Sequence, residues 1–169
     1  THCISSAASD VYKRQLQIFA DAYTPVVDSS AIPTGEIASV EGTPMDFRTE
    51  KQIGQDIRAD FEQLHFTGGY DHNYVLGRPG EKKIMANAYC RESGIALEAA
   101  TDCCGVQFYA GNFIGEQTGK GGAAYHDRSA FCLESQFYPN AVNEPDFPSP
   151  VVKAGHTYHT ETSYRFYLR

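Results

Sequence analysis

A glutamate stands in the middle of an apolar, strand-like run near the end of the chain. The run extends over residues 131–138 with Glu134 at its centre, and it ends at a Pro-Asn turn. Because side chains alternate between the two faces of a strand, Phe131 and Leu133 are predicted to face away from Glu134, whereas Gln136 shares its face. A carboxylate in such a strand either faces water or is held half-buried, where it can serve as a general base.

Two further strand-like segments carry polar side chains among residues that pack well. Asp71 lies in the segment 68–76, GGYDHNYVL, and Gln107 lies in the segment 105–113, GVQFYAGNF. Carboxylates and amides beside aromatic rings suit a sugar, since its hydroxyls need donors and acceptors while its C–H faces pack on rings. Taken alone, the same pattern also fits strands whose polar side chains face solvent.

The hydrophobic pattern predicts a mainly β chain around these segments. Strands are expected over residues 16–20, 70–76, 83–90, 95–101, 106–112, 130–136 and 156–168. Apolar residues at helical spacing predict one short helix over residues 53–64. Many strands with one minor helix indicate an all-β sandwich.

Composition and charge exclude several classes of partner. The 169 residues, 41% of them hydrophobic, provide for one modest domain. The net charge is −7 and Lys and Arg form no cluster, which argues against nucleic acid and acidic membrane surfaces as partners. No window approaches the roughly 18 apolar residues of a membrane span. Five cysteines without CxxC spacing predict neither a zinc site nor a disulfide framework, and free thiols in turn favour the cytoplasm.

The first residues differ in character from the rest. Residues 1–15 show no periodicity, and the chain starts with neither Met nor an apolar signal-like stretch. We therefore expect residues 1–15 to be a non-native leader and residues 16–169 to form the domain.

Three segments, taken in order, resemble the C-terminal motifs of the aldose 1-epimerase (galactose mutarotase) family. They are residues 68–76, 105–113 and 131–136, with supporting segments at 20–26, 32–36, 119–122, 141–143 and 147–149. The resemblance covers about residues 16–169, and three ordered motifs are far more specific than any one. It implies a galactose mutarotase-like β-sandwich that is incomplete because its N-terminal half is absent.

The resemblance also implies an activity and a role for three residues. The family interconverts the α and β anomers of free aldohexoses such as galactose and glucose by opening the sugar ring. Glu134 takes the place of the general base, Asp71 that of a carboxylate that binds sugar hydroxyls, and Gln107 that of a binding amide. The implied partner is a small sugar, and no metal or organic cofactor is implied. Whether the protein is a monomer or a dimer stays open.

One departure from the family concerns the general acid. That acid is a histidine of the family's N-terminal half, and its motif is not found here, so we expect it upstream and expect this chain alone to be inactive. His72 is predicted to alternate to the face opposite Asp71, which favours a packing role. Two alternatives remain. A hexose-6-phosphate epimerase of the same fold would need Arg or Lys at the site, and a non-catalytic carbohydrate-binding sandwich would not need a carboxylate at position 134.

Overall fold

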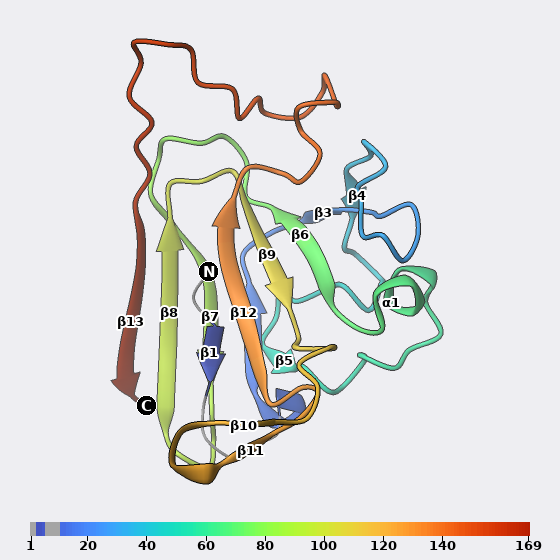
Figure 1. Cartoon of the computed structure of the whole chain (residues 1–169), viewed down its shortest axis with the longest axis vertical. Helices are drawn as coiled ribbons and strands as arrows, with labels where there is room; N and C mark the ends of the chain where they lie inside the picture. The colour runs from blue at the N-terminus through green and yellow to red at the C-terminus, as the bar shows by residue number, and fades with distance from the viewer. Residues whose placement is uncertain (1–2, 6–10) are drawn as a thin grey trace.

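The chain forms two large antiparallel sheets, as a computed structural model that describes residues 3–5 and 11–169 shows (Figure 1). In spatial order, the first sheet contains β1 (Cys3–Ser5), β12 (Ala130–Gln136), β9 (Gly105–Tyr109), β6 (Asp71–Val75), β3 (Ala22–Thr24) and β4 (Ala38–Ser39). The second contains β13 (Thr162–Leu168), β8 (Ile95–Thr101), β7 (Lys83–Tyr89), β2 (Gln15–Ile18) and β5 (Lys51–Gln52). A separate two-stranded sheet pairs β10 (Gln117–Thr118) with β11 (Ala124–Tyr125). The all-β sandwich is confirmed.

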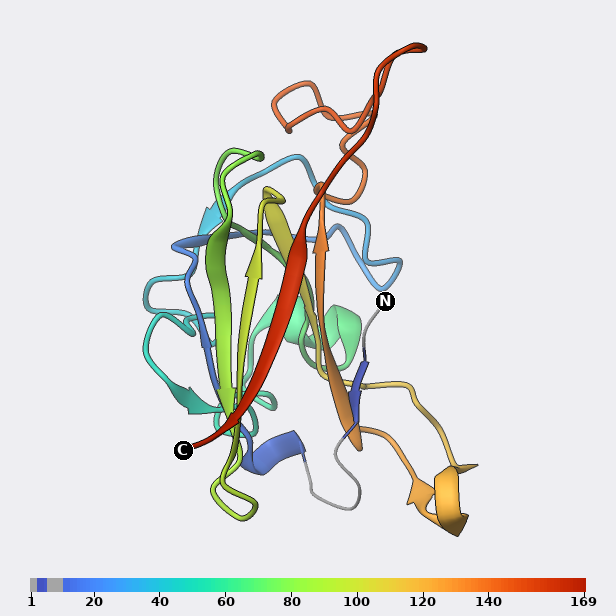
Figure 2. The same ribbon diagram turned by 90° about the vertical axis from the view of Figure 1, so that its left-hand side faces the viewer.

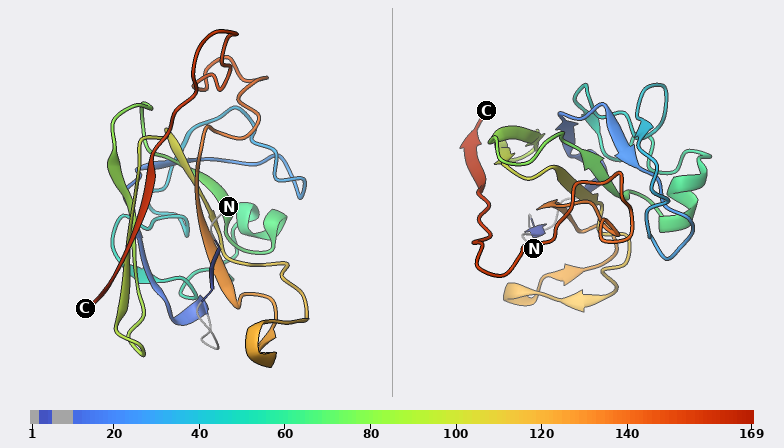
Figure 3. Two further views of the ribbon diagram at one scale, coloured as in Figure 1. Left: turned by 60° about the vertical axis from the view of Figure 1, so that its left-hand side comes forward. Right: turned by 90° about the horizontal axis from the view of Figure 1, so that it is seen from above.

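The sheets lie as two layers with the core between them (Figures 2 and 3). Phe108 of β9 stacks on Tyr70 with ring centroids 5.2 Å apart, and Phe47 contacts both rings edge-on. On the second sheet, Leu16 and Met85 are fully buried in the same cluster. Burial of apolar surface contributes about 25 cal/mol per Å², so this aromatic and aliphatic core fixes the layers.

The helix predicted over residues 53–64 is wrong in both position and length. Residues 53–58 form successive turns, residues 59–60 form a bend, and the helix α1 spans only Glu62–Thr67. Gly54 packs against Tyr12, and its N–H donates to the Tyr12 carbonyl, so the chain is held there by a tertiary contact in place of a helical bond. Ile53 and Ile57 are nevertheless buried, which explains the apolar pattern. Among the residues described, no helix is long and apolar enough to cross a membrane.

The last strand begins later than predicted. β13 starts at Thr162, and residues 156–161 have no regular structure. Its partner β8 ends at Thr101, opposite Thr162, so the earlier residues have no strand beside them with which to pair. The Asp102 carboxylate accepts the N–H of Glu161 at 2.8 Å, which fixes the point where pairing begins.

Part of the segment expected to be a leader contacts the domain. β1 pairs with β12 in antiparallel register, and the 3-10 helix η1 (Val11–Lys13) places Val11 in the core. Whether residues 1–15 are native stays a prediction, and residues 1–2 and 6–10 lie outside the described part of the chain.

Candidate active site

The three sequence-predicted site residues come together on the outer face of the first sheet. β12, β9 and β6 are neighbours there although they are far apart in sequence. The register sets Glu134 opposite Gln107, and Gln107 opposite Asn73 on its other side. Asp71 lies two residues before Asn73 on β6, opposite Tyr109. The strand order therefore collects two carboxylates and several polar groups into one patch.

The alternation predicted for these strands is confirmed. The side chains between the site residues, His72, Phe108 and Leu133, have no exposed surface and point into the sandwich. Asp71, Gln107 and Glu134 are half-buried on the opposite face. Buried residues at every second position thus anchor each strand and turn the site residues outward.

A hollow of about 350 Å³ lies over this patch. Its lining consists of Asp71, Gln107, Tyr109, Glu134, Gln136 and Pro139. Pro139 belongs to the turn that follows β12, where Asn140 adopts a φ of 64°. The volume lies in the range of small-ligand pockets, and the lining offers carboxylate oxygens, amides and one aromatic ring.

Asp71 is a half-buried carboxylate of the pocket. Burial raises the pKa of its carboxyl above the ordinary value, and a hydrogen bond from Gln107 Nε2 to Oδ1, 2.8 Å long, opposes part of that rise. The pKa of Tyr109 is also raised, by burial first and then by the nearby Asp71 charge. An ionised Asp71 is thus an acceptor with one oxygen already engaged by the protein.

Glu134 has a different environment on the neighbouring strand. No residue of the described chain donates a hydrogen bond to its carboxylate. Its charge helps to raise the pKa of Tyr164, although burial is the larger cause. A half-buried carboxylate without a protein donor can accept a proton from a bound ligand.

Sequence reasoning missed three contributors to the site. Gln136 and Tyr109 line the pocket, and Asn73 lies beneath it with 2% of its surface exposed. Alternation did place Gln136 on the same face as Glu134. What the sequence lacked was the strand order, which decides whether these faces meet.

His72 does not contribute to the pocket. Its ring packs edge-on against Tyr23 with centroids 6.0 Å apart. Burial lowers the pKa of His72 to about 4, so the imidazole is neutral at physiological pH. The packing role expected from its position in the strand is confirmed.

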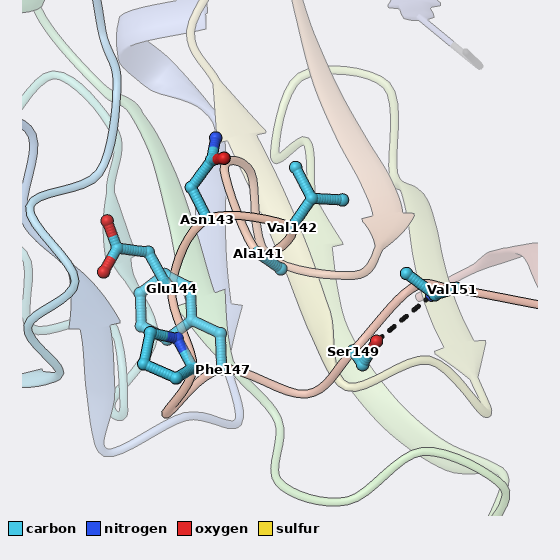
Figure 4. Close-up of a pocket in the computed structure, with 8 residues that line it drawn as sticks. Ala141, Val142, Asn143, Glu144, Phe147, Ser149 and Val151 are labelled. Carbon is cyan, nitrogen blue, oxygen red and sulfur yellow. Dashed lines mark hydrogen bonds between the residues drawn. The ribbon is translucent and has the colours of Figure 1, made fainter.

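A second hollow, of about 250 Å³, lies within the loop that follows β12 (Figure 4). Its charged lining residue, Glu144, accepts a hydrogen bond from Asn140 at 3.0 Å. None of the three predicted site residues lines it, and it is formed by one short stretch of chain. Over residues 3–5 and 11–169, no group of three or more His, Cys, Asp or Glu is arranged to hold a metal ion.

Comparisons with known proteins identify similar chains. The profile of the aldose 1-epimerase family matches residues 3–165. The chain is 43% identical over 158 residues to galactose mutarotase of Rattus norvegicus and 38% identical over 161 residues to aldose 1-epimerase of Escherichia coli. These alignments cover 93% and 94% of the chain but 44% and 46% of the relatives, so the chain spans about half the length of the curated relatives it matches.

Solved structures agree in fold. An aldose epimerase homologue from C. elegans superposes with a TM-score of 0.81 at 27% identity, covering 96% of this chain and 48% of that one. Galactose 1-epimerase from Lactobacillus acidophilus superposes with a TM-score of 0.67 at 23% identity, covering 94% and 45% respectively.

Proposed function

The chain belongs to the aldose 1-epimerase family, and we propose from this that it serves an isomerase that interconverts the α and β anomers of free aldohexoses. The observation that carries the proposal is the meeting of Glu134, Gln107 and Asp71 in one pocket. Each of these residues belongs to one of the three segments that resemble the family's motifs.

In the proposed mechanism Glu134 is the general base. Its carboxylate removes the proton of the anomeric hydroxyl while a general acid protonates the ring oxygen, and the bond between C1 and that oxygen breaks. The open aldehyde turns about C1–C2, and the reverse steps close the ring on either face. The described residues that line the pocket provide the base and the groups that bind sugar. None of these lining residues is a histidine that could act as the general acid.

Asp71 and Gln107 are proposed to hold the sugar hydroxyls. A carboxylate accepts hydrogen bonds from hydroxyls, and an amide can both donate and accept. The pocket lining contains two carboxylates and neither Lys nor Arg, which favours a free sugar over a sugar phosphate.

The test is Glu134→Gln in the protein produced from its complete gene. Glutamine keeps the shape and can still bond the sugar but cannot take a proton. We expect the mutarotation rate of galactose, followed by polarimetry, to fall about 10²–10⁴-fold while sugar affinity changes little. Glu98→Gln, the same change at a carboxylate of β8 in the other sheet, is the matched control.

Two outcomes would overturn the assignment. Unchanged mutarotation by Glu134→Gln would remove Glu134 from the chemistry. Galactose binding without any catalysed mutarotation in the unmodified protein would indicate a non-catalytic sugar-binding sandwich.

We also propose that the protein works in the cytoplasm. The supporting observation is that Cys90, Cys103 and Cys104 are buried thiols that form no disulfide. Free thiols persist in reducing compartments. Fractionation of expressing cells tests this, and recovery with an oxidising compartment would contradict it.

A further inference from the structure

Three side-chain amides from three adjacent strands form a continuous chain of hydrogen bonds that ends on Asp71. Gln136 Nε2 of β12 donates to Asn73 Oδ1 of β6 at 3.1 Å and to Gln107 Oε1 of β9 at 2.9 Å. Gln107 Nε2 then donates to Asp71 Oδ1 at 2.8 Å. We call Asn73, Gln136 and Gln107 the amide relay.

The relay has one favourable direction while Asp71 is ionised. The NH₂ group of Gln136 lies between two amide oxygens, so turning this amide over would set its oxygen against both. Rotating the Gln107 amide by a half turn would place its NH₂ group against the NH₂ group of Gln136. It would also place its oxygen against the Asp71 carboxylate. An ionised carboxylate only accepts hydrogen bonds, so each such reversal replaces bonds by repulsive contacts.

The far end of the relay is held by packing. Asn73 is 2% exposed, and its Oδ1 lies close beneath Gly105, where an added Cβ would collide with that oxygen. The same Cβ would lie 2.9 Å from Cδ1 of Tyr138, so the space is closed from the other side as well. Gly105 is therefore the residue that leaves room for the relay to begin.

We infer that Gln136 and Asn73 are positioning residues that fix Gln107 as a donor to Asp71 Oδ1 and leave Asp71 Oδ2 to accept from a sugar hydroxyl. The part of the inference that concerns sugar rests on the proposed function. The orientation of Gln107 and its effect on Asp71 do not rest on it. By donating to the charged form of Asp71, the relay opposes the penalty that burial places on that form.

Three other titratable groups lie around Asp71. Glu134 on β12 shares the pocket, and Tyr109 on β9 lies directly opposite in the register. His72 is turned into the core on the same strand, although its Nδ1 accepts the backbone N–H of Asp71 at 3.2 Å. A variant of the relay leaves all three in place, so a change in the titration of Asp71 reports the relay.

The test compares Gln136→Met, Gln136→Glu and Asn73→Ala by NMR, using the 169-residue chain without sugar. The ¹³C signal of the Asp71 carboxyl is followed against pH and assigned with Asp71→Asn. We expect the titration midpoint to move to higher pH in all three variants, and furthest in Gln136→Glu, which loses the donor and adds a charge. Glu98→Gln, which changes a charge in the other sheet, is the control and should leave the Asp71 titration unchanged.

The neutral variants decide the outcome. Unchanged Asp71 titration in both Gln136→Met and Asn73→Ala would overturn the inference, whatever Gln136→Glu does. A second readout is the pair of Gln107 side-chain NH₂ signals, which should be well separated in the unmodified chain and approach each other in Gln136→Met. Identical Gln107 NH₂ signals in Gln136→Met and in the unmodified chain would also contradict the inference.

Kinetics separate this inference from the proposed function. In protein that catalyses mutarotation, we expect Gln136→Met to raise KM for galactose about tenfold, the effect of one weakened charge-assisted hydrogen bond, with a smaller change in kcat. A shifted Asp71 titration with unchanged KM would overturn the sugar-binding role of Asp71 while leaving the orientation intact. Failure of Glu134→Gln to lower activity would leave the NMR result untouched.

Discussion

His72 affects the stability of the fold, although it lies in the same motif as the site residue Asp71. It separates Asp71 from Asn73, yet its side chain is fully buried, and no described residue contacts its Nε2 with a hydrogen bond. A buried neutral imidazole resists protonation because the charged form would lose its hydration. Its pKa of about 4, against 6.5 in the unfolded chain, couples folding to pH.

The sign of this coupling predicts acid sensitivity. As pH falls from 6.5 to about 4, the unfolded chain gains a proton at this position before the folded one, so stability is lost through that window. We expect His72→Phe, which keeps a ring against Tyr23, to lose less stability over this range, by up to about 3 kcal/mol. Urea denaturation at pH 7, 5 and 4 measures it. His65→Gln, at an exposed histidine of α1, is the control, and equal acid sensitivity in His72→Phe and the unmodified chain would contradict the explanation.

Burial disfavours the charged form of Asp71 as well, but here it makes stability depend on pH in the opposite direction. Burial raises its pKa, so between the ordinary value of 3.8 and the raised one the folded chain holds a proton that the unfolded chain has released. Stability therefore falls as pH rises through that window, and the ionised carboxylate weakens the fold at neutral pH. Functional sites commonly keep such groups, and the hydrogen bond from Gln107 reduces the cost.

At the scale of elements, strand patterns were predictable and the helix was not. Alternation predicted β12 and β8 residue by residue and β6, β7 and β9 within a few residues, because each strand has a buried face. Apolar residues at helical spacing arise when one side of a segment is buried. In residues 53–64 a series of turns, and not a helix, buries Ile53 and Ile57. Local periodicity cannot distinguish the two when tertiary contacts hold the turns.

The site was predictable only in part, for a related reason. Glu134, Asp71 and Gln107 stood out by residue type and by resemblance, but the amide relay depends on which strands are neighbours. β12 lies beside β9, and β9 beside β6, an order that does not follow the sequence. A role for Gln136 appears only once the register places its amide between the oxygens of Asn73 and Gln107.

Gly105 links the fold of these strands to the site, and a substitution there tests the link. Gly105→Ala would force the Asn73 and Tyr138 side chains apart, and we expect a loss of about 1–3 kcal/mol in the free energy of unfolding. Asn73→Ala should remove much of the obstruction, so Gly105→Ala should cost less in that background. A double-mutant cycle by denaturant unfolding measures the coupling, and additive effects of the two substitutions would contradict the close contact.

At the scale of the whole molecule, β13 is a largely exposed strand of the sandwich. It lies at the end of its sheet and pairs only with β8 among the described strands (Figure 1). Tyr164 ties it to the other sheet, because its hydroxyl donates to the Leu133 carbonyl at 2.7 Å. Phe166 and Leu168 continue on the same face of the strand, yet they are 58% and 80% exposed.

An open strand edge beside exposed apolar side chains favours association. We expect the 169-residue chain to self-associate with increasing concentration, and Phe166→Lys to shift sedimentation profiles toward the monomer, since a charge on that face would have to be buried on contact. Ser163→Lys adds the same charge on the opposite face of β13 and is the matched control, because it leaves the apolar side chains unchanged.

If both variants reduced association equally, the unpaired edge of β13 and not its apolar face would be the cause of association. A chain that stays monomeric at every concentration would show that neither one drives contact, although Phe166 and Leu168 lie exposed.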